Sequence, residues 1–124
     1  IPAFDLMATK NDRTVRVRVK TKSEEYPEWQ WVVKKDGSIF RSLSENGDFT
    51  VLVNLAMNNS ALKFFVVPTK LVNQWLREDF EEWLRTPGKF GRSHSDANKK
   101  RHLNEHKRAP DLAPYLNNWD TLWS

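Results

Sequence analysis

The chain has 124 residues, of which 39% are hydrophobic and 29% are charged, and this composition is typical of a single globular domain. It contains no cysteine, which excludes a disulfide framework and a thiolate zinc site. The net charge of +4 is compatible with a polyanionic partner but does not identify one. Because no apolar run approaches the length of a membrane span, we expect a cytoplasmic protein without a membrane partner.

Turn signals divide the first half of the sequence into short segments with β character. The expected strands cover residues 3–9, 13–23, 28–35, 49–57 and 61–68. The dipeptides Asp36-Gly37 and Asn46-Gly47 are strong turn formers that separate the third and fourth of these runs. The fifth run is almost entirely apolar at its centre, which predicts a strand that is buried on both faces.

The periodicity then changes to that of a helix. From Lys70 to Arg85, apolar residues recur at spacings of one, three and four, which places them on one stripe of a helix. Thr69 is the expected N-cap, and the Thr-Pro-Gly stretch at 86–88 is expected to end the helix. We therefore predict an α/β domain, with a mixed or antiparallel sheet of about five strands and a helix packed after the last strand.

Residues 86–124 are predicted to form a basic loop followed by an aromatic tail. The segment 89–110 holds seven Lys or Arg residues and only two acidic residues, which indicates a surface loop. One or two helical turns are expected near residues 98–107. The tail at 111–124 is rich in aromatic residues, and we expect it to pack back onto the domain.

The second expected strand, residues 13–23, alternates apolar and basic side chains. Successive side chains of an extended strand point to opposite faces, so the valines should line one face and the cations the other. The cations of this ladder are Arg16, Arg18, Lys20 and Lys22.

An aspartate and a lysine on neighbouring strands form the candidate catalytic constellation. If the first two strands pair as a hairpin that turns around residues 11–13, Asp5 lies level with residues 18–20. A carboxylate and the Lys20 amine on one face would hold a divalent metal ion and orient a water molecule, as metal-assisted phosphodiester hydrolysis requires. A surface ion pair has the same spacing, so the pattern alone leaves both interpretations open.

Residues 4–23, which read FDLMATKNDRTVRVRVKTKS, resemble the PD-(D/E)xK nuclease-like superfamily, and in particular small bacterial restriction-endonuclease-like members. Residues 48–55, 62–76 and 117–123 also resemble later strands, the start of the following helix and the tryptophan-containing tail of such members. The resemblance implies one restriction-endonuclease-like domain over residues 1–124. The superfamily core begins with a helix before the first strand, and the sequence starts at what would be that strand. The helix therefore either lies upstream of Ile1 or is not part of this protein.

The resemblance also implies roles for individual residues. Asp5 would bind the metal ion, for which Mg²⁺ is expected, together with the backbone carbonyl of Val19, and Lys20 would position the attacking water. The sequence departs from the pattern at Arg18, because the superfamily has an acid or amide there and a guanidinium repels a cation. Metal binding would then require a compensating carboxylate. The nearest candidates in the sequence are Glu24, Glu25 and Glu28, although they lie beyond the useful end of the strand.

Three hypotheses of different classes follow from these patterns. The first is a metal-dependent nuclease acting on DNA, with Asp5 and Lys20 at its centre. The second is a nuclease fold without catalysis that binds nucleic acid through exposed cations. Those cations would be Arg16, Arg18, Lys22, Lys99, Lys100 and Arg101. The third is a protein-interaction module whose basic strand is only a solvated surface. A homodimer is expected by analogy with the superfamily alone.

Overall fold

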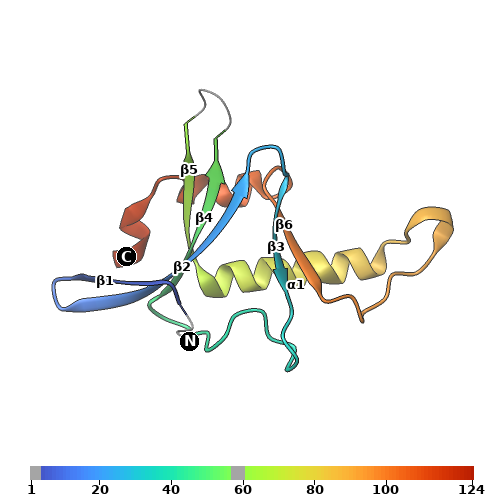
Figure 1. Cartoon of the computed structure of the whole chain (residues 1–124), viewed down its shortest axis with the longest axis horizontal. Helices are drawn as coiled ribbons and strands as arrows, with labels where there is room; N and C mark the ends of the chain where they lie inside the picture. The colour runs from blue at the N-terminus through green and yellow to red at the C-terminus, as the bar shows by residue number, and fades with distance from the viewer. Residues whose placement is uncertain (1–3, 57–60) are drawn as a thin grey trace.

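The computed structural model describes residues 4–56 and 61–124 (Figure 1). A four-stranded sheet contains β1 (Leu6–Lys10), β2 (Arg13–Ser23), β4 (Asp48–Leu55) and β5 (Lys63–Pro68). A second, two-stranded sheet contains β3 (Glu28–Val32) and β6 (Lys100–Asn104). The long helix α1 (Thr69–Arg85) follows β5 directly. Shorter helical elements are η1 (Lys89–Gly91), α2 (Ala109–Leu112), η2 (Ala113–Tyr115) and η3 (Trp119–Trp123).

The larger sheet has mixed strand directions, in the order β1-β2-β4-β5. β2 and β4 run parallel, whereas β1 pairs with β2 and β5 pairs with β4 in antiparallel fashion. The predictions of an α/β architecture, of a mixed sheet and of a helix after its last strand are therefore confirmed. The prediction of one sheet of about five strands is wrong, because β3 leaves that sheet and pairs with β6.

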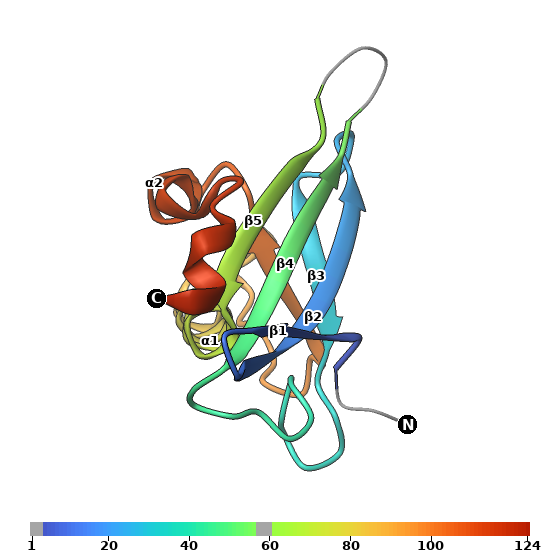
Figure 2. The same ribbon diagram turned by 90° about the vertical axis from the view of Figure 1, so that its left-hand side faces the viewer.

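Two hydrophobic cores lie on opposite faces of β4 and β5. On one face, Leu52 and Phe65 pack with Trp75 of α1 and with Leu103 of β6. On the other face, the valines of the sheet pack with Leu122 of the C-terminal tail. Figure 2 shows this arrangement, with α1, β3 and β6 behind the four-stranded sheet. The predictions that β5 is buried on both faces and that the tail packs back onto the domain are confirmed.

Two local predictions are wrong for identifiable physical reasons. Thr69 is not the helix cap, since Pro68 occupies that position and the Thr69 hydroxyl instead lies 2.8 Å from the buried Thr50 hydroxyl. The expected helical turns near 98–107 are replaced by β6, because Leu103 pairs with Trp29 and both enter the core. Residues 3 and 57, at the ends of two expected strands, lie outside the described residues.

Candidate functional site

The predicted hairpin of the first two strands is present with the expected register. Asn11 and Asp12 have φ values of 50° and 64°, the left-handed conformation that a tight two-residue hairpin turn requires. Leu6 pairs with Val17, and the N–H of Asp5 donates to the Val17 carbonyl at 3.0 Å. Asp5 therefore lies at the level of residues 18–20, as predicted.

The backbone of β2 fixes the direction of the Asp5 side chain. The Oδ2 atom of Asp5 accepts a hydrogen bond from the Val19 N–H at 2.7 Å. This contact holds an otherwise exposed carboxylate against the edge of β2. A charge-assisted hydrogen bond of this kind limits the rotamers that the side chain samples.

Asp5, Val19 and Lys20 line one shallow pocket between β2 and the segment that follows β3. Its other lining residues are Phe4, Arg18, Trp31, Phe40 and Thr50. The Nζ atom of Lys20 lies 5.2 Å from the centre of the Trp31 ring, and the side chain is half-buried. Burial lowers the pKa of Lys20 from its ordinary value of 10.5, because an ammonium group loses hydration there. The structure thus brings together the three residues for which the resemblance implies a catalytic centre.

Arg18 forms a buried, two-point ion pair with Asp48. Its Nε and Nη2 atoms donate to the two carboxylate oxygens of Asp48 at 2.9 and 2.8 Å, and Nη2 also donates to the Arg41 carbonyl at 3.0 Å. The side chain of Asp48 is fully buried. The carboxylate that offsets the Arg18 charge is therefore Asp48, which the sequence pattern did not indicate.

Asp48 is held in its ionised form by its surroundings. Burial acts to raise the pKa of this carboxyl, but the hydrogen bonds from Arg18 and from the Ser44 N–H outweigh it. The net result is a pKa below the ordinary value of 3.8. Arg16 adds a second cation, with Nη2 at 3.4 Å from the same carboxylate. The Asp48 carboxylate thus remains ionised at neutral pH, where it pairs with Arg18.

Lys22, at the other end of the predicted basic ladder, is buried in the same manner. Its ammonium lies 2.7 Å from Glu105, donates to the Tyr26 carbonyl at 2.9 Å, and sits 4.8 Å from the centre of the Trp29 ring. Asn54 donates a further hydrogen bond to Glu105 at 2.8 Å.

The expectation of an open basic face along β2 is therefore wrong at two positions. Arg18 is 8% exposed and Lys22 is 7% exposed, because β3 and the segment after it cover this face. Neither side chain is presented to a nucleic acid in this structure. Burial is also uneven on the valine side, since Val15 and Val17 are buried while Val19 is 42% exposed.

The other basic segment, residues 86–101, carries the excess charge of the chain, and we call it the basic arm. It contains five Lys or Arg residues and one acidic residue, so its formal charge equals the +4 of the whole chain. The rest of the sequence holds equal numbers of basic and acidic residues. Attraction to a polyanion is therefore expected to come mainly from this arm.

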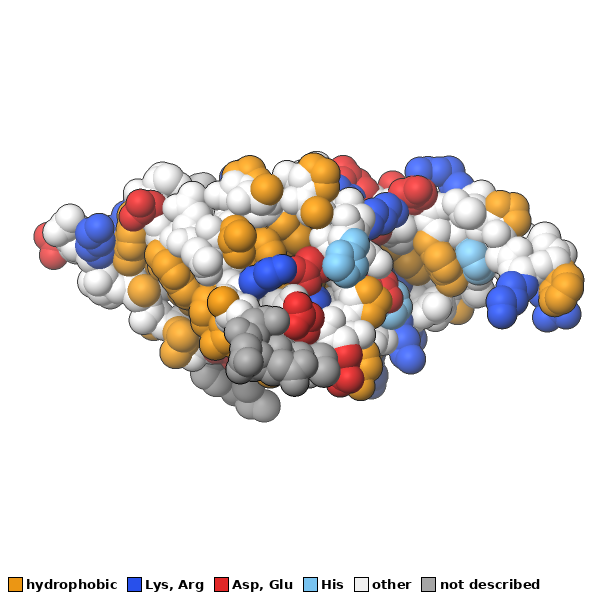
Figure 3. Space-filling model, turned by 90° about the horizontal axis from the view of Figure 1, so that it is seen from above, with side chains coloured by type: hydrophobic (Ala, Val, Ile, Leu, Met, Phe, Trp, Pro, Cys, Tyr) orange, Lys and Arg blue, Asp and Glu red, His pale blue; other side chains and the backbone are white. Residues whose placement is uncertain are grey.

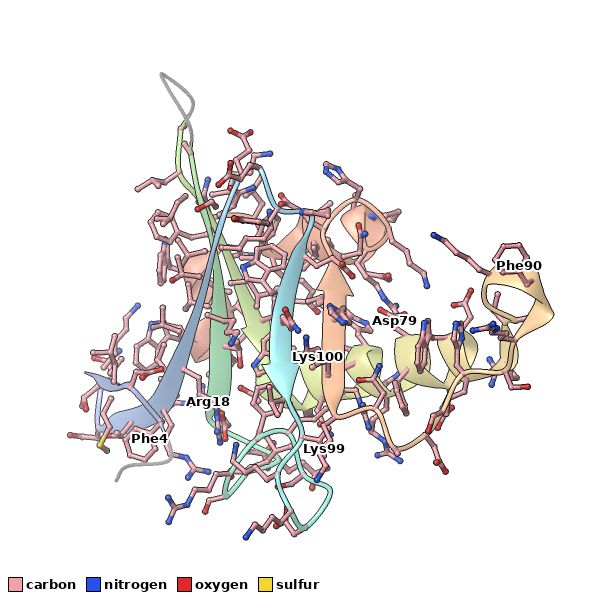
Figure 4. All side chains as sticks on the ribbon, turned by 45° about the vertical axis from the view of Figure 1, so that its right-hand side comes forward. Phe4, Arg18, Asp79, Phe90, Lys99 and Lys100 are labelled. Carbon is pink, nitrogen blue, oxygen red and sulfur yellow. The ribbon has the colours of Figure 1, made fainter. Side chains whose placement is uncertain are left out.

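The predicted binding cations of the arm differ in their surroundings. Lys99 and Lys100 are exposed (Figure 4). Arg101 instead stacks on Phe80, with its guanidinium carbon 3.4 Å from the ring centre, and burial lowers its pKa from the ordinary value. Its Nη1 atom donates to the carbonyls of Asn98 and Lys100 at 2.6 and 3.0 Å. Arg101 thus has a structural role here, whereas Lys99 and Lys100 are displayed to solvent.

Comparisons of this chain with protein-family models, with curated proteins and with solved structures find no match. Within residues 4–56 and 61–124, no helix is long and apolar enough to cross a membrane. Across the same residues, no three or more His, Asp or Glu side chains gather in a way that could hold a metal ion.

Proposed function

We propose that this chain is a nuclease-like protein of the restriction-endonuclease-like class that binds nucleic acid, with DNA as the expected substrate. The proposed reaction is phosphodiester hydrolysis in the pocket of Asp5, Val19 and Lys20. One observation carries the proposal: a carboxylate and a partly buried lysine line the same pocket, and the carboxylate accepts a hydrogen bond from the Val19 N–H between them in the pocket lining. This is the arrangement that the sequence resemblance implies.

The donor atoms of the pocket suit Mg²⁺ only if the ion is shared with the substrate. Mg²⁺ prefers oxygen ligands, keeps several waters, and uses one or two carboxylates together with phosphate oxygens. Asp5 supplies one carboxylate, and the Val19 carbonyl would supply a second oxygen, because a strand residue directs its N–H and C=O to the same edge. When bound, the ion would neutralise charge on the scissile phosphate and polarise a water molecule.

Lys20 would handle the proton of the attacking water. Its lowered pKa makes the neutral amine more accessible than that of a solvated lysine. A neutral amine accepts a hydrogen bond from water and takes its proton as the attack on phosphorus begins. Trp31 restricts where the amine is placed, and the Val19 N–H restricts the carboxylate of Asp5.

Arg18 is the residue that argues against catalysis, and its ion pair with Asp48 reduces that objection. Two hydrogen bonds to a buried carboxylate offset the charge that would otherwise repel a cation in the adjacent pocket. A second candidate function remains, which is nucleic-acid binding without cleavage. It is favoured by the absence of an acidic or amide side chain at position 18.

The test combines plasmid nicking with Mg²⁺ and Mn²⁺ titration by calorimetry on the wild type and on two variants. We expect metal-dependent nicking that falls by about 100-fold or more in Asp5→Asn and in Lys20→Met. Lys10→Met and Asp12→Asn, at exposed positions of the same hairpin, are the matched controls and should nick like the wild type.

Two results would contradict this assignment in different ways. Nucleic-acid binding without nicking in the wild type, with no heat of metal binding, would establish the non-cleaving alternative. Nicking that is unchanged in Asp5→Asn and Lys20→Met would place the active site elsewhere. Circular dichroism and urea unfolding of each variant separate loss of activity from loss of folding.

A further inference from the structure

An exposed phenylalanine occupies the tip of the basic arm. Phe90 is 94% exposed, and Figure 1 shows its segment projecting beyond the end of α1, away from both hydrophobic cores. Its backbone has φ 60° and ψ 27°, and Gly91 follows with φ 71°. A bulky residue rarely adopts this left-handed conformation. The turn therefore holds the backbone of Phe90 in an unfavourable conformation, and its ring is exposed to solvent.

Hydrogen bonds within the loop hold this turn closed. The N–H of Gly88 donates to the Arg92 carbonyl at 2.7 Å, and the N–H of Gly91 donates to the Gly88 carbonyl at 3.2 Å. The N–H of Arg92 donates to the Lys89 carbonyl at 3.3 Å. The backbone of the tip is therefore ordered by its own contacts.

His94 fastens the base of the loop to α1. Its ring stacks on the Trp83 ring with centres 3.9 Å apart and planes 4° apart, and its Nδ1 atom lies 2.6 Å from the Trp83 carbonyl. Gly88 packs directly on His94, because a Cβ atom at residue 88 would lie 2.8 Å from Nε2. The close approach of Gly88 to His94 thus depends on the absence of a side chain.

The stack continues into the body of the protein. Trp83 stacks on Phe80 with ring centres 5.5 Å apart. The guanidinium carbon of Arg101, in β6, lies 3.4 Å from the centre of the Phe80 ring. The arm is therefore tied at both ends, to α1 and to β6. A pre-organised support of this kind lowers the ordering entropy that binding would otherwise require.

Cations flank the exposed ring in the sequence. Lys89 and Arg92 flank Phe90 in the sequence, and Asp96 is the only acidic residue of the arm. Figure 3 shows hydrophobic and basic side chains together at the right-hand end of the molecule, where this loop lies. An aromatic ring between cations matches a nucleic-acid strand, whose flat bases alternate with phosphates. An apolar protein surface would match the ring but not the charges.

We propose that the basic arm binds a nucleic-acid strand, with Phe90 stacking on an accessible base while Lys89, Arg92, Lys99 and Lys100 contact phosphates. This inference rests on the proposed nucleic-acid partner and identifies the contact surface, which lies apart from the Asp5–Lys20 pocket. It also predicts a preference for single-stranded or gapped DNA over intact duplex, because bases inside a duplex are already stacked.

Fluorescence anisotropy with a labelled single strand, a gapped duplex and an intact duplex tests the stacking contact. We expect Phe90→Ala to weaken binding to the single strand about fivefold or more, with Phe90→Trp restoring it. Tyr26→Ala, which removes another exposed aromatic ring from the β2–β3 turn, is the matched control and should bind like the wild type. Inorganic polyphosphate, which has charge without bases, should bind wild type and Phe90→Ala equally.

Three results would overturn the inference. The first is equal affinity of wild type and Phe90→Ala for the single strand. The second is a loss of polyphosphate affinity in Phe90→Ala that is as large as its loss of affinity for the single strand. The third is a dimer in sedimentation that dissociates in Phe90→Ala without any change in DNA affinity, which would assign the ring to self-association. Failure here is distinct from failure of the proposed function, because nicking variants at Asp5 and Lys20 leave the arm unchanged.

Discussion

β2 and the basic arm have similar numbers of cations but use them differently. On β2, Arg18 and Lys22 are buried against Asp48 and Glu105, so their charges are satisfied within the fold. On the arm, Lys99 and Lys100 are exposed, and the segment carries the net charge of the chain. A basic pattern in sequence therefore does not locate a binding surface until the partners of each cation are known.

The comparison predicts opposite responses to substitution in the two regions. Removing one partner of a buried ion pair leaves an uncompensated charge in the interior and costs about 3–5 kcal/mol. Substitution of an exposed side chain changes stability by about 0.5 kcal/mol or less. Changes on β2 should therefore reduce stability, and changes on the arm should reduce nucleic-acid affinity.

The largest expected effect is that of Asp48→Asn. The amide keeps the shape of the carboxylate but removes the charge that pairs with the buried Arg18 guanidinium, so we expect a loss of about 3–5 kcal/mol in the free energy of unfolding. Urea unfolding followed by circular dichroism measures this change. Asp96→Asn, on the arm, makes the same chemical change at an exposed position and should alter stability by less than about 0.5 kcal/mol. If the two substitutions changed the free energy of unfolding equally, the contrast between the buried cations of β2 and the exposed cations of the arm would be wrong.

A smaller effect is expected for Gly88→Ala in the arm. The new methyl group would lie too close to His94 Nε2, so the loop must shift to relieve the contact. We expect this shift to lower the free energy of unfolding by about 1 kcal/mol. The displaced tip should also bind DNA more weakly. A double-mutant cycle with His94→Ala isolates the contact. If Gly88→Ala costs as much in the His94→Ala background as in the wild type, the packing of Gly88 on His94 is not the cause.

The smallest effect is the acid dependence of the Arg18–Asp48 pair. The folded protein holds the pKa of Asp48 below 3.8, so the unfolded chain binds the proton more readily. This contribution to stability is present above pH 3.8 and is lost as the pH falls through the folded pKa. Thermal unfolding from pH 5 to pH 2 should show a shallower decline in Asp48→Asn than in the wild type. Parallel declines would show that Asp48 has no lowered pKa.

Local pattern was sufficient to predict β1 to β5, α1 and the level at which Asp5 meets β2, but not β6. Alternation, turn dipeptides and helical spacing depend on neighbouring residues, and the hairpin register follows from a short turn. The three residues of the candidate pocket were therefore accessible from sequence, with the resemblance supplying their roles.

The partners of Arg18 and Lys22 were not accessible in the same way. Asp48 reaches Arg18 because β4 runs parallel to β2, and Glu105 reaches Lys22 because β6 joins β3, and both pairings are long-range. Phe90 stands between lysine and glycine in a basic segment, but this pattern alone does not show whether its ring is exposed. Its exposure was decided by the His94–Trp83 stack, which joins residues eleven positions apart.

The salt dependence of DNA binding tests most directly whether the arm carries the contact. Lys99→Gln/Lys100→Gln removes two exposed charges of the arm, and Lys10→Gln/Lys70→Gln removes two exposed charges elsewhere. The slope of log K against log salt should fall by roughly 0.7 for each lost contact to a single strand in the arm variant, and stay unchanged in the control. Equal slopes in the two variants would contradict the account, because the contact with nucleic acid would then lie outside the arm.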